Sequence, residues 1–363
     1  MKKTNIKLLL LLFVLGSLAG CQQTGSVLKL NEVQFLGSHN SYKKAIDPAL
    51  LQMLAANDPR TAAGLDYSHR PLTEQLNLGM RKLELDVFYD PEGGRYANPV
   101  GLVAIPDPLP WAAELVQKPG FKVFHVQDID FRSHCVVFAT CLQQLADWSD
   151  AHPAHFPVFI LINAKTDKIP RPDFVEPLPF DAAAWNALDL ELRSGLKQKL
   201  FTPDELRGDY ATLREAVMAG WPALDAMRGR ILVVLDDSAE KKAFYAQGHP
   251  SLRDRAMFTD APADSDEAAI MVINEPLRDG ARITEMVRQG FIVRTRADAD
   301  TSEARTGNTD RREAAFNSGA QIIATDYYLP DDRFESGYKV ELPEGGIARC
   351  NPVLISTPCV ISQ

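Results

Sequence analysis

Short apolar runs rich in β-branched residues recur along the chain and alternate with stretches of helical period. The apolar runs lie at 33–36, 82–87, 122–126, 158–162, 231–235, 269–273, 291–294 and 321–324. The helical stretches between them include 72–78, 142–151, 182–198, 283–289 and 311–317. Eight strands alternating with helices predict a TIM-type (β/α)8 barrel over residues 33–330, and the strand count favours it over a doubly wound open sheet.

The chain changes character after the last predicted strand. Residues 331–363 contain Pro343, Gly345, Gly346 and Pro352 and show no helical period. Such residues interrupt helices. We therefore expect an irregular C-terminal tail and a barrel whose eighth helix is missing or displaced.

The first 21 residues have the pattern of an export signal. A lysine-containing start precedes an apolar run at 8–18, which is too short to span a bilayer. The following Leu-Ala-Gly-Cys sequence, ending at Cys21, resembles the lipobox of bacterial lipoproteins, in which the cysteine is acylated. We expect an exported protein anchored to the cell envelope through Cys21, with residues 22–32 as a tether. Gln22 suggests the outer membrane in a cell with two membranes, and an ordinary cleaved signal is the alternative.

Four cysteines remain once Cys21 is set aside. An even number in an exported chain favours disulfides, and the local pairs Cys135–Cys141 and Cys350–Cys359 are preferred among three possible pairings. The net charge of −9 argues against binding to nucleic acid, which requires a basic surface. No protein partner is inferred.

Polar residues stand at the carboxyl end of every predicted strand. In a barrel these ends converge on one mouth, where the active site lies. In strand order, the residues are His39 and Asn40; Glu84 and Asp86; His125; Asn163 and Lys165; Asp236 and Asp237; Asn274 and Glu275; Arg294 and Arg296; and Asp326.

Two of these residues are candidates for acid–base chemistry. His39 and His125, at the ends of the first and third predicted strands, could face each other across a phosphate group. One would deprotonate an attacking hydroxyl, and the other would protonate the leaving oxygen. The remaining histidines are expected at the surface: His69, His134, His152, His155 and His249.

Two carboxylates are candidates for metal binding. Glu84 and Asp86 are two residues apart on one strand, so their side chains share a face. Like charges this close repel each other unless a cation intervenes. With an amide oxygen from Asn40 they suit a hard divalent ion, and ligand type alone leaves calcium and magnesium open. The alternative is a pair of solvated carboxylates that form ion pairs with Arg81 or Lys82.

Three segments carry a resemblance to a known family. They are Gly-Ser-His-Asn-Ser-Tyr at 37–42, Leu-Glu-Leu-Asp at 83–86 and Val-Phe-His-Val-Gln-Asp at 123–128. In this order and spacing they resemble the calcium-dependent bacterial branch of the phosphoinositide-specific phospholipase C family, a group of TIM-barrel phosphodiesterases. The likeness extends from about residue 33 to 330, with 293–298 and 324–327 also similar.

The resemblance implies a role for each candidate. It makes His39 and His125 the acid–base pair and Asn40, Glu84 and Asp86 the calcium ligands. The family's further ligand, usually a carboxylate, falls on Asn163, which predicts weaker calcium binding. The metal-independent branch instead carries an arginine on its second strand, and none stands beside Asp86.

Other residues are expected to bind the substrate, a phosphatidylinositol-type lipid at a membrane surface. Lys165, Asp236, Arg294 and Arg296 are candidates to hold phosphate or inositol hydroxyls. Asp326 ends the eighth predicted strand, which borders the first when the barrel closes, so it could orient His39.

Two other functions compete with this interpretation. Related barrels cleave glycerophosphodiesters, but their first strand usually ends in His-Arg, whereas Asn40 follows His39 here. A non-catalytic envelope lipoprotein that binds a phosphorylated ligand is the other alternative. The presence of both histidines and both carboxylates argues against it. The lipid headgroup and the choice between a cyclic and an open phosphate product stay open.

Overall fold

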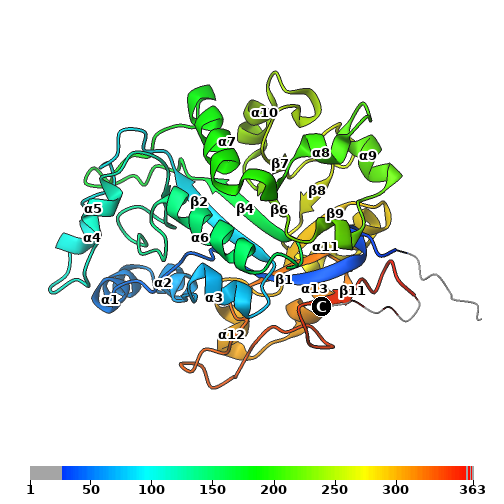
Figure 1. Ribbon diagram of the computed structural model, residues 1–363. Helices are drawn as coiled ribbons and strands as arrows, with labels where there is room; N and C mark the ends of the chain where they lie inside the picture. Colours follow the sequence, from blue (N-terminus) through cyan, green and yellow to red (C-terminus); the bar gives the residue numbers. More distant parts are fainter. Residues whose placement is uncertain (1–26, 357–358, 360, 362–363) are drawn as a thin grey trace, which may run out of the picture.

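The structure is a computed structural model that describes residues 27–356, 359 and 361. Its centre is a curled parallel sheet whose hydrogen-bonded strands run in the order β6, β4, β2, β1, β10, β9, β8, with β7 on the far side of β6. A parallel bridge between Asp260 and Ile270 joins β7 to β8 and closes the ring. The predicted TIM-type barrel is therefore confirmed (Figure 1). The barrel strands are β1 (Val33–Ser38), β2 (Lys82–Phe88), β4 (Val158–Ala164), β6 (Ile231–Leu235), β7 (Phe258–Thr259), β8 (Ile270–Val272), β9 (Ile292–Arg296) and β10 (Ile322–Thr325).

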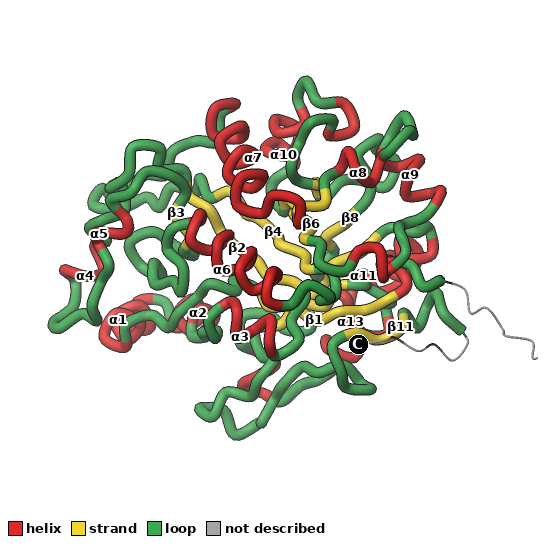
Figure 2. The backbone as a smooth tube through the Cα atoms, in the orientation of Figure 1, coloured by secondary structure: helices red, strands yellow, loops and turns green. Residues whose placement is uncertain are grey.

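Helices surround this barrel (Figure 2). The longer ones bury an apolar face: α6 buries Leu142 and Leu145, and α7 buries Trp185 and Leu188, at the spacing that puts residues on one side of a helix. The α-helices are α1 (Pro48–Asn57), α2 (Pro59–Leu65), α3 (Leu72–Asn77), α4 (Val100–Val103), α5 (Ala113–Val116), α6 (Phe138–Ala151), α7 (Ala182–Leu196), α8 (Pro203–Arg207), α9 (Leu213–Ala219), α10 (Ala239–Ala246), α11 (Pro276–Arg288), α12 (Ser302–Thr306) and α13 (Asp310–Asn317). The 3-10 helices are η1 (Leu30–Glu32), η2 (Lys197–Lys199), η3 (Leu224–Met227) and η4 (Pro250–Leu252).

One predicted barrel strand is wrong. The apolar run at 122–126 forms only the short strand β3 (Lys122–Val123), which pairs antiparallel with the end of β2. Its place in the barrel count is taken by β7, which the sequence pattern did not predict. Another short strand, β5 (Leu200–Phe201), lies parallel to the start of β6.

The tail after β10 packs back on the barrel. No helix occurs among residues 326–356, as predicted for a barrel without its eighth helix. Instead β11 (Ala348–Cys350) pairs antiparallel with the start of β1. The Cys350–Cys359 disulfide lies in this tail, and the Cys135–Cys141 disulfide lies at the start of α6.

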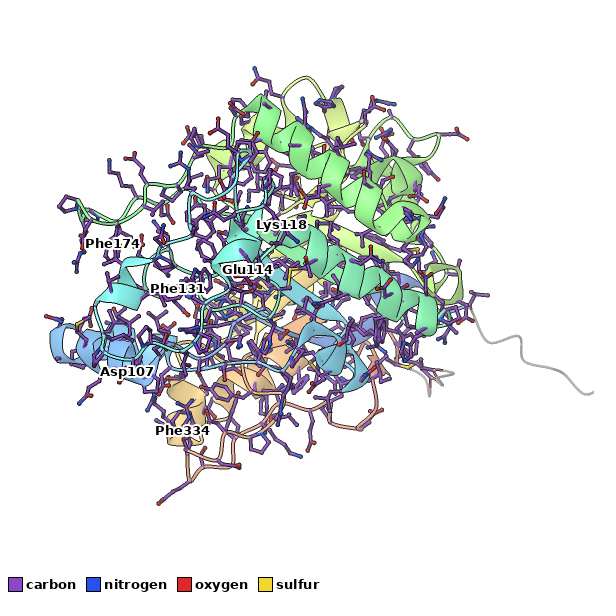
Figure 3. The ribbon with its side chains drawn as sticks, turned by 60° about the vertical axis from the view of Figure 1, so that its left-hand side comes forward. Asp107, Glu114, Lys118, Phe131, Phe174 and Phe334 are labelled. Atoms are coloured by element: carbon purple, nitrogen blue, oxygen red, sulfur yellow. A yellow bond between two sulfur atoms is a disulfide. The ribbon has the colours of Figure 1, made fainter. Side chains whose placement is uncertain are left out.

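The two ends of the barrel are built differently. The loops after β2 carry α4, α5 and β3 at the carboxyl end of the strands, on the left of Figure 1, whereas β11 lies at the amino end. Figure 3 brings the carboxyl end forward and shows Asp107 and Phe174 on its loops and Glu114 on α5. Among the described residues, none of the helices has the length and apolar character needed to cross a membrane.

Candidate active site

His39 and Asp326 lie side by side because they follow neighbouring strands. Ser38 at the end of β1 pairs with Thr325 at the end of β10. The His39 Nδ1 atom is 3.1 Å from Asp326 Oδ1, and its Nε2 atom is 3.6 Å from Glu84 Oε1. Burial, helped by the charge of Arg296, lowers the pKa of His39 below its usual value. Burial alone would raise the pKa of Asp326. The hydrogen bond and charge of His39, together with the charge of Arg296, outweigh this effect and hold the Asp326 pKa well below its usual value.

His125 also has a carboxylate partner, which the sequence analysis missed. It stands in the loop after β3, not at the end of a barrel strand, and its position in the sequence prediction is corrected accordingly. A tight turn closed by a bridge between Val126 and Asp130 brings His125 Nδ1 to 2.9 Å from Asp130 Oδ2. The buried Lys43 Nζ lies 3.1 Å from the same oxygen. Burial works against ionisation of Asp130, but Lys43 and His125 outweigh it and lower the Asp130 pKa.

Both histidines line one cavity of about 800 Å³ at the carboxyl end of the barrel. About a fifth of each histidine side chain is exposed, 19% for His39 and 20% for His125, so a ligand in the cavity can reach both rings. The wall also includes Tyr67, Arg296 and Asp326, and residues of α2 and α12 complete it. The two residues proposed as an acid–base pair therefore share one binding site.

The predicted metal-binding carboxylates have cationic partners. Glu84 Oε2 accepts hydrogen bonds from Lys82 Nζ and, at 2.9 Å, from Arg294 Nη2. Burial opposes ionisation of Glu84, but Lys82, His39 and Arg294 lower its pKa far below the usual value. Asp86 Oδ2 lies 3.3 Å from Lys165 Nζ. Cations of the chain itself therefore relieve the repulsion between the two carboxylates.

The donor set still has the chemistry that calcium requires. Asp86 on β2 pairs with Asn163 on β4, two residues beyond Glu84. The amide nitrogen of Asn163 donates to the Asp236 carbonyl at 2.9 Å, and that of Asn40 donates to the Tyr67 hydroxyl at 2.7 Å. Their amide oxygens therefore remain to act as ligands. In the described part of the chain, no cluster of three or more His, Cys, Asp or Glu side chains suits a metal, and the proposed set accordingly combines two carboxylates with two amides.

The predicted substrate-binding residues fall into different environments. Arg296 lines the cavity, and its Nη2 atom lies 3.5 Å from Asp326 Oδ2. Burial raises the pKa of Asp236 to about 6. Arg294 is only 1% exposed and donates to Glu84 and Asn274, so it supports the site from inside the barrel. Contact between Arg294 and the substrate stays a prediction.

His69 is a further residue that the sequence analysis missed. It is buried, so its predicted surface position is wrong, and the same correction applies to His155. The His69 Nε2 atom donates to the backbone carbonyl of His39 at 2.6 Å and lies 3.6 Å from Asp326 Oδ1. It thereby holds both members of the His39–Asp326 pair. The Tyr-Ser-His sequence around it contains no periodic signal that could have indicated this contact.

Comparison with known proteins identifies relatives of this arrangement. Residues 28–352 match the sequence profile of a family described as Ca²⁺-dependent phosphoinositide phospholipase C. A comparison with curated proteins finds no match.

Solved structures with a similar fold include two bacterial enzymes. One is the calcium-dependent phosphoinositol-specific phospholipase C of a Gram-negative Pseudomonas sp., in an apo form with myoinositol. Its sequence is 18% identical and the TM-score is 0.53, and the match covers 89% of this chain and 96% of that one. The Ca²⁺-dependent phosphatidylinositol-specific phospholipase C of Streptomyces antibioticus is also 18% identical, with a TM-score of 0.50, over 83% of this chain and 95% of that one. At this identity, the structural matches support the fold.

Proposed function

Since the chain belongs to the Ca²⁺-dependent phosphoinositide phospholipase C family, we propose that it cleaves phosphatidylinositol-type lipids into diacylglycerol and an inositol phosphate. Membership makes it a phosphoric diester hydrolase of a family that uses calcium. One observation carries the proposal. Two histidines line the same cavity, and each is hydrogen-bonded through Nδ1 to a buried carboxylate. Neither a glycerophosphodiesterase nor a non-catalytic lipoprotein is favoured by any observation of comparable weight.

His39 is the proposed general base. Its Nδ1–H donates to Asp326, which leaves the Nε2 lone pair to accept a proton. The lowered pKa keeps the ring neutral near pH 7, as a base must be. Arg296, on the cavity wall, is placed to hold a phosphoryl oxygen or an inositol hydroxyl.

His125 is the proposed general acid. Asp130 accepts its Nδ1–H, so the proton on Nε2 is the one available to the leaving group. As the inositol 2-hydroxyl loses its proton to His39, its oxygen forms a bond to phosphorus. The bond from phosphorus to the diacylglycerol oxygen breaks, and that oxygen takes the proton from His125. The first product is then a cyclic inositol phosphate, which can be hydrolysed in a second step.

Asn40, Glu84, Asp86 and Asn163 are the residues proposed to hold calcium. When bound, the ion supplies positive charge that acidifies the attacking hydroxyl and stabilises the phosphoryl oxygens. Glu84 would then contact both the ion and the Nε2 side of His39, since its Oε1 atom lies 3.6 Å from that nitrogen. Lys165, beside Asp86, is a further candidate to hold the phosphate.

Release of headgroup from defined lipids tests the proposed function. We expect phosphatidylinositol vesicles to yield diacylglycerol and inositol phosphate with added calcium, and little product in excess chelator. Phosphatidylcholine vesicles and glycerophosphoinositol serve as comparison substrates. Faster turnover of glycerophosphoinositol would support the glycerophosphodiesterase alternative, and no turnover of any diester would contradict the proposal.

Membrane attachment through Cys21 is a second testable proposal. Cys21 lies outside the described residues. Leu28 and Leu30 hydrogen-bond to residues of the segment before β6, so the described chain begins at the amino end of the barrel, opposite the cavity. We expect Cys21→Ala to release active enzyme into the soluble envelope fraction or the medium. Continued fractionation with membranes after a salt wash would refute the anchor.

A further inference from the structure

A buried lysine occupies the inner side of the proposed calcium site. Lys82 stands two residues before Glu84 on β2, so the two side chains share a face. Lys82 is fully buried, its Nζ atom contacts the Glu84 carboxylate, and it donates to the Ser38 carbonyl at 2.9 Å. A charged lysine is rarely enclosed in this way without a paired carboxylate. Glu84 is therefore the partner on which this lysine depends.

The position of Lys82 is fixed by its surroundings. Gly37 on β1 pairs with Lys82 on β2, and a Cβ atom at Gly37 would overlap the Cβ and carbonyl oxygen of Lys82. The two strands therefore approach closely at this point, and the Lys82 side chain is fully enclosed. Lys165, the partner of Asp86, differs in this respect, since 18% of its side chain is exposed and it can turn outward when a ligand arrives.

We infer that Lys82 acts as a built-in competitor for the calcium ion at Glu84 and sets a low calcium affinity. Positive charges that share one carboxylate repel each other, strongly so where water is excluded. Arg294 adds to this repulsion, because it donates to the same Glu84 oxygen. Asn163, which pairs with Asp86 across the sheet, is a neutral amide and adds no negative charge that would offset this repulsion.

This inference rests on the proposed function, because it takes Glu84 as a calcium ligand. Lys82 is the residue to test, since methionine keeps the length and burial of its side chain while removing the charge. Replacing Arg294 instead would leave Asn274 without its donor. A matched control is Lys122→Met. Lys122 is also a fully buried strand lysine, and its Nζ atom lies 3.1 Å from Asp90 Oδ2. This pair is not part of the proposed calcium site.

Calcium titration by calorimetry on the full-length purified protein, without lipid, tests the inference. We expect Lys82→Met to bind calcium at least about tenfold more tightly than the wild type, whereas Lys82→Arg and Lys122→Met keep the wild-type affinity. Unchanged or weaker binding by a Lys82→Met variant with a wild-type circular dichroism spectrum overturns the inference. If Lys82→Met does not fold, the same titration is done with Lys82→Gln, whose amide can still donate to the Ser38 carbonyl. Tighter calcium binding by this variant supports the inference, and unchanged or weaker binding overturns it.

A separate arm of the titration tests the proposed ligands. Asp86→Asn should weaken calcium binding whatever Lys82 does, because it removes a proposed ligand charge. Undiminished binding by Asp86→Asn would remove the ligand assignment on which the inference stands. If Asp86→Asn weakens calcium binding but Lys82→Met leaves it unchanged, the ligand assignment stands and the proposed competition between Lys82 and calcium is rejected.

Discussion

His125→Ala is expected to slow cleavage of phosphatidylinositol by about 10²–10⁴-fold while largely sparing a substrate with a phenolic leaving group. The diacylglycerol oxygen is a poor leaving group unless it is protonated, and His125 is the proposed source of that proton. A phenolate leaves without such help. The proposed base is a different case, since the attacking hydroxyl must lose its proton whichever group departs. His39→Ala should therefore impair both substrates to a similar degree.

The comparison of the two variants, measured as kcat/KM on both substrates, is the informative result. His152→Ala is a suitable control, because His152 is an exposed histidine at the end of α6 that does not line the cavity. Asp130→Asn should slow the reaction less than His125→Ala, since Asp130 contacts the Nδ1 side of that ring, and it should also lower stability, because the buried Lys43 loses its carboxylate partner. If His39→Ala and His125→Ala respond alike to the leaving group, the assignment of acid and base is wrong, although both residues could still belong to the site.

The barrel was largely predictable because several of its strands are runs of mainly apolar residues. β4 and β6 bury almost every residue, and such runs between helical stretches are the usual mark of a parallel sheet. β7 escaped prediction because two residues, Phe258 and Thr259, make no pattern. The run at 122–126 was mistaken for a barrel strand, since an apolar run does not reveal which strand it pairs with or in which direction.

The site residues that stand at strand ends could be predicted from the sequence, whereas those that stand in loops could not. His39 and Asp326 are 287 residues apart, yet their contact follows from the closure of the barrel, because the last strand returns to the first. Asp130 and His69 reach the site from loops, whose course cannot be read from periodicity. The enclosure of Lys82 against Glu84 is likewise visible only in the structure, because a charged residue at the start of a strand is usually solvated.

Glu84→Gln is expected to destabilise the protein in calcium-free buffer by about 3–5 kcal/mol, the usual cost of leaving a buried charge without its partner. Glu84 is the carboxylate that neutralises both Lys82 and Arg294, and both cations are enclosed by the barrel. A neutral glutamine can accept a hydrogen bond but cannot balance two charges. Chemical denaturation followed by circular dichroism measures the loss as a change in the free energy of unfolding.

Asp86→Asn is the matched control for this loss. Its partner Lys165 is partly exposed and can be solvated once the carboxylate is gone, so we expect a clearly smaller destabilisation. Combining Glu84→Gln with Lys82→Met should recover part of the stability, since one of the two unpaired cations is then absent and the effects of contacting residues are not additive. Equal losses for Glu84→Gln and Asp86→Asn, or a double variant as unstable as the sum of its single changes, would show that the buried cations do not depend on Glu84.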